Sequence, residues 1–181
     1  MNKKDIEKER EELSKVLLNV WCISDTHFYH KNIGKYCNRP ENWFDLIINN
    51  WNRIVNKNDT VLHFGDFSFR SFEKAKNVKQ RLNGKIYLIR GNHDRHSKTW
   101  YKKLNINAIS PFEAEINGKN YYFSHKPSKN LNVGISNIHG HWHNKCPFIY
   151  IAKNGNINVN LSVEVIDYTP IRLNDVIEMV K

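Results

Sequence analysis

The sequence predicts an α/β fold in which two β-sheets pack together with helices outside. Three observations lead to this fold class. A length of 181 residues suits one compact domain. The first half alternates strand-like and helix-like segments, and the second half changes to alternating apolar and polar residues with hairpin dipeptides between them. We therefore expect one domain over residues 19–181, preceded by an N-terminal helical extension over residues 1–18.

The first half is expected to form helices between short buried strands. Apolar residues at helical spacing predict a helix over residues 4–18. Pro40 opens a second helix that ends near Val55, and Ser71 caps a third helix that ends near Leu82. Apolar segments that stop at polar or glycine residues predict three strands, at residues 20–23, 60–64 and 85–89.

The second half is expected to form mainly β-hairpins. Two turn dipeptides lie between apolar segments with a period of two, which is a strong hairpin signal. They are Asn117-Gly118, between residues 112–116 and 121–123, and Asn154-Gly155, between residues 148–152 and 157–161. The other expected elements are a helix at residues 98–104, a strand at residues 163–166 and a helix from about Asn174.

Composition and cysteine usage exclude several classes of protein. Hydrophobic residues make up 40% and charged residues 25%, which excludes a disordered or fibrous chain. Cys22, Cys37 and Cys146 are odd in number and far apart, which excludes a disulfide framework and a zinc–thiolate site. No apolar run approaches the ~20 residues of a membrane helix, and the first 15 residues mix acids and bases. We therefore expect a cytoplasmic protein without a membrane segment or secretory signal.

The formal net charge of +10 is concentrated in one window. Residues 70–103 hold eleven Lys and Arg residues against only Glu73 and Asp94, whereas acids and bases nearly balance elsewhere. A basic face attracts phosphate-rich partners such as nucleotides and nucleic acids. A solvated helix face in a chain rich in Lys, Asn and Ile explains the window equally well, and the sequence leaves both interpretations open.

Metal-binding residue types form five short motifs, and the first four directly follow predicted strands. The motifs are Asp25-Thr26-His27, Gly65-Asp66, Gly91-Asn92-His93-Asp94, Ser124-His125 and Gly140-His141-Trp142-His143. Each motif alone is more often structural, but ligands usually bind at strand ends in such sheets, so together they predict one site. Carboxylates, imidazoles and an amide oxygen suit divalent ions such as manganese, iron or zinc. Seven ligand-type residues exceed the needs of one ion, which favours two ions that share a carboxylate.

Two of the motifs carry ligand types at alternating positions. Side chains at alternating positions of an extended chain face the same way, so Asp25 and His27 should point into one site, as should His141 and His143. Trp142 should then face the opposite way. Packing is the first interpretation of Trp142, and stacking on a nucleobase is the second.

The ordered pattern D-x-H, G-D, G-N-H-D, H and G-H-x-H resembles that of the calcineurin-like metallophosphoesterase superfamily. The resemblance covers residues 20 to about 175, and residues 24–33 are similar to a small bacterial and phage branch. It implies a four-layer α/β/β/α sandwich with two mixed β-sheets. It also implies a metal-dependent phosphoesterase.

The resemblance implies a role for each motif residue. One ion would be held by Asp25, His27, Asp66 and His143, and the other by Asp66, Asn92, His125 and His141. Two divalent ions, manganese first and iron, zinc or nickel as alternatives, would lower the pKa of a bound water and give a hydroxide that attacks phosphorus. His93 would contact the phosphate and protonate the leaving group.

The chain departs from the protein-phosphatase branch after its second motif. Phe69 stands where that branch has an Asp that orients the catalytic histidine, and Arg70 matches the position of its phosphate clamp. We expect substrate contacts from His30, Asn32 and Arg70, with a helix-start role as the alternative for Asn32. Arg39 is also expected near the rim of the site.

These observations favour hydrolysis of a phosphodiester, in a nucleotide or a nucleic acid that the basic window over residues 70–103 helps to bind. A phosphomonoesterase acting on small metabolites is the nearest alternative. A metal-free scaffold that binds protein partners is a third alternative, which the seven intact ligand positions and His93 argue against. The oligomeric state is left open.

Overall fold

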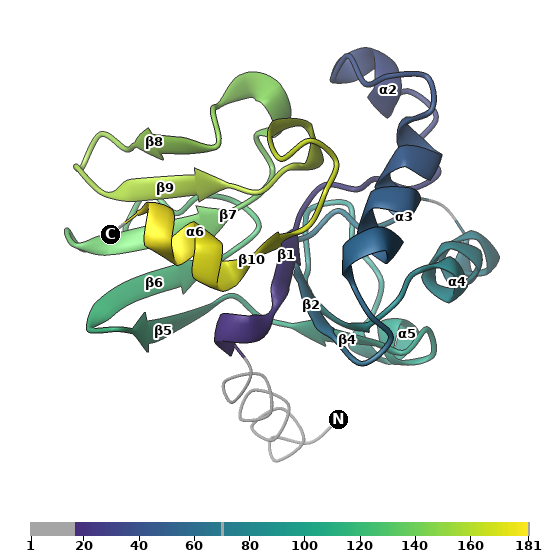
Figure 1. The fold of residues 1–181 in the computed structure, drawn as a ribbon, viewed down its shortest axis with the longest axis horizontal. Helices are drawn as coiled ribbons and strands as arrows, with labels where there is room; N and C mark the ends of the chain where they lie inside the picture. The colour runs from purple at the N-terminus through teal and green to yellow at the C-terminus, as the bar shows by residue number, and fades with distance from the viewer. Residues whose placement is uncertain (1–16, 70, 181) are drawn as a thin grey trace.

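Two five-stranded β-sheets lie against each other in the computed structural model, which describes residues 17–69 and 71–180 (Figure 1). Both sheets are mixed, and the predicted α/β fold is confirmed. The predicted helix over residues 4–18 lies outside the described residues except for its last two positions. Those two positions begin the 3-10 helix η1 (Leu17–Asn19).

The first sheet has the strand order β10-β1-β2-β3-β4. Its strands are β1 (Trp21–Ile23), β2 (Thr60–His63), β3 (Lys85–Ile89), β4 (Ile106–Ile109) and β10 (Ile171–Arg172). The first four run parallel, and β10 is antiparallel to β1. Leu62 packs into the core between the sheets, whereas its neighbour Val61 packs under the helices. Both faces of this sheet are therefore buried, as expected for parallel strands.

The described helices are α2 (Ile33–Tyr36), α3 (Trp43–Ile54), α4 (Phe72–Arg81), α5 (Lys98–Lys102) and α6 (Leu173–Met179). Helices α3, α4 and α5 cover the outer face of the first sheet (Figure 1), and Trp51 of α3 is fully buried there. Helix α6 packs against the core between the sheets, beside η1 and β10. Pro40 lies in a turn before α3 and accepts a hydrogen bond from the backbone N–H of Trp43 at 3.0 Å, so this helix begins later than predicted. Ser71 stands at the N-cap position of α4, as expected.

The second sheet has the strand order β5-β6-β7-β9-β8. Its strands are β5 (Phe112–Ile116), β6 (Lys119–Phe123), β7 (Ile135–His139), β8 (Ile149–Ile151) and β9 (Ile157–Asn160). Both predicted hairpins are confirmed, because β5 pairs with β6 and β8 with β9 in antiparallel fashion. Asn117 and Gly118 have φ angles of 53° and 75°, the left-handed conformation that two-residue hairpin turns require.

The two faces of the second sheet differ in polarity. Phe123, Ile138 and Val159 point into the core between the sheets and are fully buried. Polar residues alternate with them on the opposite face, among them Asn137 and His139 of β7. Loops and polar side chains, rather than α3, α4 and α5, therefore border this outer face.

Several of the described elements differ from the prediction. Strands β4, β7 and β10 were not expected, and residues 163–166 form the 3-10 helix η3 (Val163–Val165) instead of a strand. Local backbone bonds explain the last difference: the N–H of Val165 donates to the carbonyl of Ser162 at 3.0 Å, and that of Tyr168 donates to Val163 at 2.8 Å. These local bonds form a 3-10 turn, and pairing with the segment after β1 is limited to a bridge between Ser24 and Ser162.

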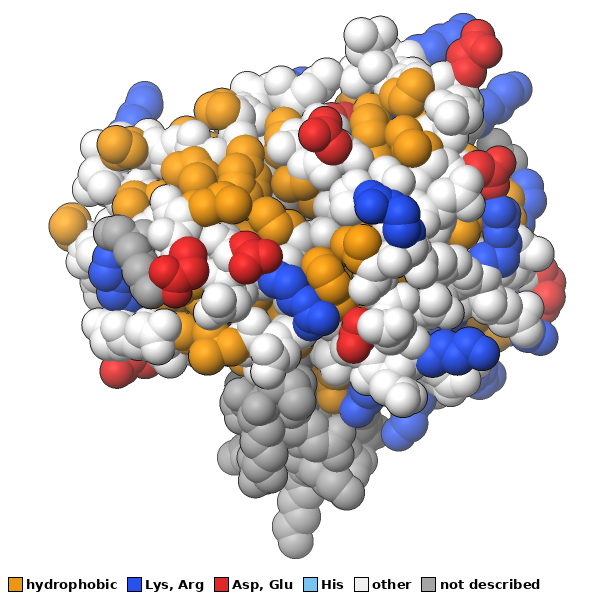
Figure 2. All heavy atoms as spheres, in the orientation of Figure 1, with side chains coloured by type: hydrophobic (Ala, Val, Ile, Leu, Met, Phe, Trp, Pro, Cys, Tyr) orange, Lys and Arg blue, Asp and Glu red, His pale blue; other side chains and the backbone are white. Residues whose placement is uncertain are grey.

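Lys and Arg side chains gather on the side of the molecule where α4 and α5 lie (Figure 2). Part of the charge of the basic window is used locally, because Arg81 pairs with Asp45 at 2.7 Å and Lys79 donates to the carbonyl of Gly84 at 3.3 Å. Binding of nucleic acid by this window stays a prediction. Within the described part of the chain, no helix is long and apolar enough to cross a membrane.

Candidate metal centre

Five loops that follow strands meet at one place between the two sheets. Asp25, Asp66 and Asn92 follow the parallel strands β1, β2 and β3, whose ends share one edge of the first sheet. His125 and His141 follow β6 and β7, which are parallel neighbours in the second sheet. Because the ends of parallel strands meet at the same edge of a sheet, residues far apart in the sequence come together.

The backbone at this place is left-handed at five of the ligand-type residues. The positive φ angles are 57° at Asp25, 48° at His27, 56° at Asp66, 72° at His141 and 49° at His143. Non-glycine residues rarely adopt this conformation, and when they do they cluster at functional sites. The prediction that each ligand pair lies on an extended chain is therefore wrong, because tight turns aim these side chains.

Asp25, His27 and His143 form a first group, whose ligand atoms all lie within 4.8 Å of one another. Asp25 Oδ1 lies 3.8 Å from Nε2 of each histidine, and the two rings stack with centroids 5.2 Å apart. Oδ1 is buried and has no hydrogen-bond partner among the described residues. A buried carboxylate oxygen without a donor is costly unless a cation meets it.

Asp66, His125 and His141 form a second group within the same 4.8 Å limit. His125 Nδ1 lies 2.8 Å from the carbonyl of Phe64, which can only accept, so Nδ1 carries the proton. In the neutral ring, the lone pair of Nε2 then faces Asn92 Oδ1 at 3.1 Å and Asp66 Oδ2 at 3.5 Å. Acceptors that face one another in this way fit a shared cation.

Asp66 lies between the two groups. Its Oδ2 is 3.5 Å from His27 Nε2 of the first group and 3.5 Å from His125 Nε2 of the second. Its Oδ1 accepts a hydrogen bond from the backbone N–H of His93 at 2.8 Å, which fixes the orientation of the carboxylate. One oxygen is therefore held by the protein, and the other faces both groups.

Burial and neighbouring charges shift the pKa values of these residues. Burial raises the pKa of Asp66 to about 7, and the charge of Asp25 adds to this shift. Burial opposes the charged form of Asp25 as well, but the imidazoles around it outweigh burial and hold its pKa well below the usual range. Burial lowers the pKa of His27 and lowers that of His141 to about 4. Both rings are thus neutral near pH 7, the form that binds a metal ion.

A buried ion pair between Arg39 and Glu164 contacts His143 of the first group. His143 Nδ1 lies 3.0 Å from Glu164 Oε1, the same oxygen that accepts hydrogen bonds from Arg39 at 2.6 and 2.8 Å. Burial lowers the pKa of His143, but its bonds to Cys37 and Glu164 outweigh burial and raise the pKa to about 10. Cys37, His143 and Glu164 also form a cluster of metal-binding types, but the guanidinium of Arg39 already neutralises the carboxylate there.

Arg39 differs from its predicted place near the rim. It is only 7% exposed and donates to the carbonyls of Asp25 and Thr26 at 2.7 and 3.0 Å. Glu164 was not predicted to contact a ligand, because its two partners lie far away in the sequence. Its arrangement, a carboxylate that holds the second nitrogen of a ligand histidine, is a common support for metal-binding histidines.

Two glycines let the loops approach closely. A Cβ atom on Gly91 would collide with Asp66 Oδ1, and one on Gly140 would collide with the side chains of Ser24 and Asp25. Asp94, which is buried, binds the loops together by accepting from the backbone N–H groups of Asp66 at 2.6 Å and Gly91 at 2.9 Å. Sequence motifs marked these residues, but only the structure shows this role.

His93 lies at the open side of the centre. Its ring is partly buried and contacts the rings of His27 and Phe69, with centroids 5.3 and 5.7 Å away. Burial lowers its pKa. None of the described side chains donates a hydrogen bond to the ring or accepts one from it. An apolar ring thus stands beside His93 where the protein-phosphatase branch has an orienting carboxylate.

The predicted substrate contacts have different outcomes. His30 is near the centre, with its ring 4.6 Å from Phe69 and 6.2 Å from His93 between centroids. Asn32 is exposed at the N-cap position of α2, where its side chain makes no cap hydrogen bond and instead donates to the hydroxyl of Tyr36 at 3.4 Å. Arg70 lies outside the described residues.

The sequence matches the model of a known family over residues 18–173, namely calcineurin-like phosphoesterase. The chain belongs to the calcineurin-like phosphoesterase family. It is 35% identical over 174 residues to an uncharacterized protein of Methanocaldococcus jannaschii, a match that covers 90% of this chain and 91% of that protein. Its fold is similar to the crystal structure of a protein of unknown function from Aquifex aeolicus, with a TM-score of 0.66, 24% identity and coverage of 89% and 98%.

Family membership settles the general activity. The chain is a metal-dependent phosphoesterase, a hydrolase that acts on phosphate esters. The donors of the two groups fit this activity, because they combine carboxylate oxygens with imidazole nitrogens around a buried oxygen that has no hydrogen-bond partner in the described structure.

Proposed function

We propose that this phosphoesterase hydrolyses phosphodiesters at a centre of two divalent ions. The observation that carries the proposal is the position of Asp66 Oδ2, at 3.5 Å from one imidazole nitrogen of each group. Asp25, His27, Asp66 and His143 would hold one ion, and Asp66, Asn92, His125 and His141 would hold the other. When bound, such ions polarise a phosphoryl group and lower the pKa of water.

The protein's own residues orient the reaction. Asp66 and Asp25 each bind a backbone N–H through one oxygen, at 2.8 Å from His93 and from His141 respectively, so both carboxylates are fixed before substrate arrives. His93 stands beside the centre on its open side, where a protonated ring can donate to the leaving oxygen. We assign His93 as the general acid.

Two hollows beside the second group support a diester over a monoester. A hollow of about 660 Å³ is lined by His141, and one of about 330 Å³ is lined by Asn92 and His125. The two share Lys126 and Ser128. A diester has two organic groups on its phosphate and a monoester has one, so two adjoining hollows beside the second group suit a diester.

Manganese is the first choice of metal, with iron, zinc or nickel as alternatives. Both groups contain only nitrogen and oxygen donors, which borderline and hard divalent ions prefer over soft thiolate sites. The test is elemental analysis of manganese-loaded protein with hydrolysis of bis-p-nitrophenyl phosphate and p-nitrophenyl phosphate. We expect two ions per chain and a kcat/KM at least about tenfold higher for the diester. A preference for the monoester would contradict the proposal.

A further inference from the structure

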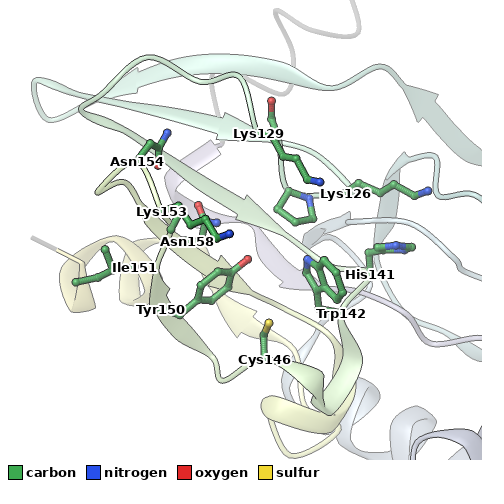
Figure 3. Close-up of a pocket in the computed structure, with 13 residues that line it drawn as sticks. Lys126, Lys129, His141, Trp142, Cys146, Tyr150, Ile151, Lys153, Asn154 and Asn158 are labelled. Atoms are coloured by element: carbon green, nitrogen blue, oxygen red, sulfur yellow. The ribbon is translucent and has the colours of Figure 1, made fainter.

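The larger hollow lies on the polar outer face of the second sheet and opens onto the metal centre. Its wall includes His141, a ligand-type residue of the second group, and its floor includes Asn158 of β9 and Tyr150 of β8 (Figure 3). With a volume of about 660 Å³, it has room for a ligand much larger than a phosphate. It is therefore a side chamber of the centre.

Trp142 forms one wall of the hollow. Its neighbours His141 and His143 both have left-handed backbone conformations, and both turn toward the centre. Trp142 is directed away from the centre, is 38% exposed and lines the hollow. Its ring meets that of His141 with centroids 5.8 Å apart at 63°. A large aromatic face is thus available directly beside a candidate metal ligand.

Tyr150 stands across from Trp142 in the hollow (Figure 3). Its hydroxyl lies 2.9 Å from Nε2 of the buried His139, and His139 Nδ1 bonds the carbonyl of Gly140 at 2.6 Å. Because a carbonyl can only accept, Nδ1 carries the proton of the neutral ring and the tyrosine hydroxyl donates to Nε2. The tyrosine ring is therefore held in place without a ligand.

Lysines carried by a fixed loop supply positive charge. Lys126 and Lys129 both line the hollow, and Figure 3 shows the Lys129 ammonium extending from the loop toward Trp142. The loop is anchored by the fully buried Asn137, whose Oδ1 accepts from the backbone N–H of Ser128 at 2.7 Å. Lys126 also lines the smaller hollow, so positive charge borders both sides of the second group.

We propose that the larger hollow binds a nucleobase of a nucleotidyl phosphodiester, stacked on Trp142, while Lys126 and Lys129 contact the adjoining phosphates. This proposal rests on the proposed phosphodiesterase activity and names its substrate class. An aromatic face with lysines beside it is the combination that binds single-stranded nucleic acid and nucleotides, because every base has a π-face and every linkage carries a negative charge. The basic window over residues 70–103 is a separate surface, since none of these lysines belongs to it.

Binding to manganese-loaded protein tests the proposal directly. The probe is a fluorescein-labelled thymidylate octamer with phosphorothioate linkages, which resist hydrolysis, followed by fluorescence anisotropy. Trp142→Ala should raise its Kd by about tenfold or more, and Trp142→Phe, which keeps an aromatic face, by less than about threefold. Lys129→Ala should raise the Kd and reduce the slope of log Kd against log salt concentration by about one.

Lys102→Ala is the matched lysine control, because Lys102 is exposed on α5, inside the basic window and outside both hollows. It should bind the octamer as the wild type does. Equal binding by the wild type and Trp142→Ala would overturn the proposal. So would a loss in Lys102→Ala as large as that in Lys129→Ala, because the oligonucleotide would then bind the basic window.

A second measurement separates this proposal from the phosphodiesterase proposal. Thymidine 5′-(p-nitrophenyl phosphate) and methyl p-nitrophenyl phosphate share a leaving group and differ in the nucleoside. Trp142→Ala should lower the ratio of their kcat/KM values by about tenfold. If the wild type hydrolyses both esters with an unchanged ratio in Trp142→Ala, only the base pocket is wrong. If neither ester is hydrolysed but the octamer binding depends on Trp142, the phosphodiesterase proposal is wrong and the pocket stands.

Competition by the dinucleotide thymidylyl-thymidine distinguishes small nucleotide diesters from single-stranded nucleic acid as the ligand of the hollow. A dinucleotide that displaces the octamer at a similar concentration supports the pocket with small nucleotide diesters as its ligands. An octamer that binds more than about tenfold tighter supports the pocket with a single strand that also occupies the smaller hollow. Failure of the dinucleotide to compete at all would contradict stacking of a single base.

Discussion

The two groups of ligand-type residues, here called the first and second half of the metal centre, hold their histidines in different ways. In the first, His143 is held by the carboxylate of Glu164, which forms a buried ion pair with Arg39. In the second, His125 is held by the neutral backbone carbonyl of Phe64. Both hollows are lined by residues of the second half. The first half thus has a charged partner for its histidine, whereas the second half adjoins both hollows.

The largest expected effect comes from the residue that joins the halves. Asp66→Ala should remove both ions and reduce turnover of a diester by about a thousandfold or more, because both groups lose their shared oxygen. Elemental analysis of the variant measures the ions. Asp25→Ala, which changes only the first half, is the matched comparison and should retain the second ion in part. Two ions per chain in Asp66→Ala would contradict the bridging role.

His93 lies beside both halves but belongs to neither. His93→Ala should reduce turnover by about a hundredfold or more and leave two ions per chain, because a general acid is lost while the ligands remain. A substrate with a leaving group of low pKa, such as a dinitrophenyl ester, should lose less activity than an alkyl ester. Equal losses for both esters would show that His93 acts by other means.

A substitution at Glu164 tests whether its carboxylate contributes to metal affinity and to the free energy of unfolding. Glu164→Gln should lower the affinity for one ion by about ten- to a hundredfold, since a carboxylate partner of a ligand histidine is lost. It should also lower the free energy of unfolding by about 3 kcal/mol, because Arg39 keeps its charge in a buried place. Calorimetric metal titration and chemical denaturation measure the two effects. Glu113→Gln, an exposed position on β5, should change neither.

The last expected effect is confined to stability and concerns His63, a buried histidine that touches Thr26 Oγ1 at 3.0 Å. Burial lowers its pKa from 6.5 to about 3, so below pH 6.5 the unfolded chain binds a proton that the folded protein does not. The free energy of unfolding should therefore fall as the pH drops from 6.5 toward 3, by at most about 1.4 kcal/mol per pH unit. Denaturation of His63→Gln across this range should show a smaller slope. An unchanged slope would mean that His63 is not the group that titrates.

The strand-end motifs predicted that these side chains come together, because parallel strands oblige their ends to meet. The division of residues between the halves was implied by the family resemblance, but it does not follow from the alternation of ligand types. Alternation suggested that His141 and His143 serve one site, but left-handed backbone at both sends them to different groups. Gly140, just before them, packs closely against Ser24 and Asp25, and no local pattern in the sequence records this contact.

Contacts between residues that lie far apart in the sequence were the other features that could not be predicted. Arg39 and Glu164 are 125 positions apart, so neither residue signals its partner. Strand β7 was missed because polar residues such as Asn137 occupy its outer face, yet Asn137 is fully buried and anchors the lysine loop. Lys126 and Lys129 lie outside the basic window, and net charge counted along the chain could not place them beside the centre.

The pairing of Arg39 with Glu164 has a consequence for protein synthesis. The carbonyl of Asp25 accepts from Arg39, and both Arg39 and the ring of His143 bond to a carboxylate that is translated after all three. A nascent polypeptide on the ribosome therefore carries several of the donors but lacks the clamp that orders them. The first group would therefore be ordered for a divalent ion only after Glu164 has been synthesised.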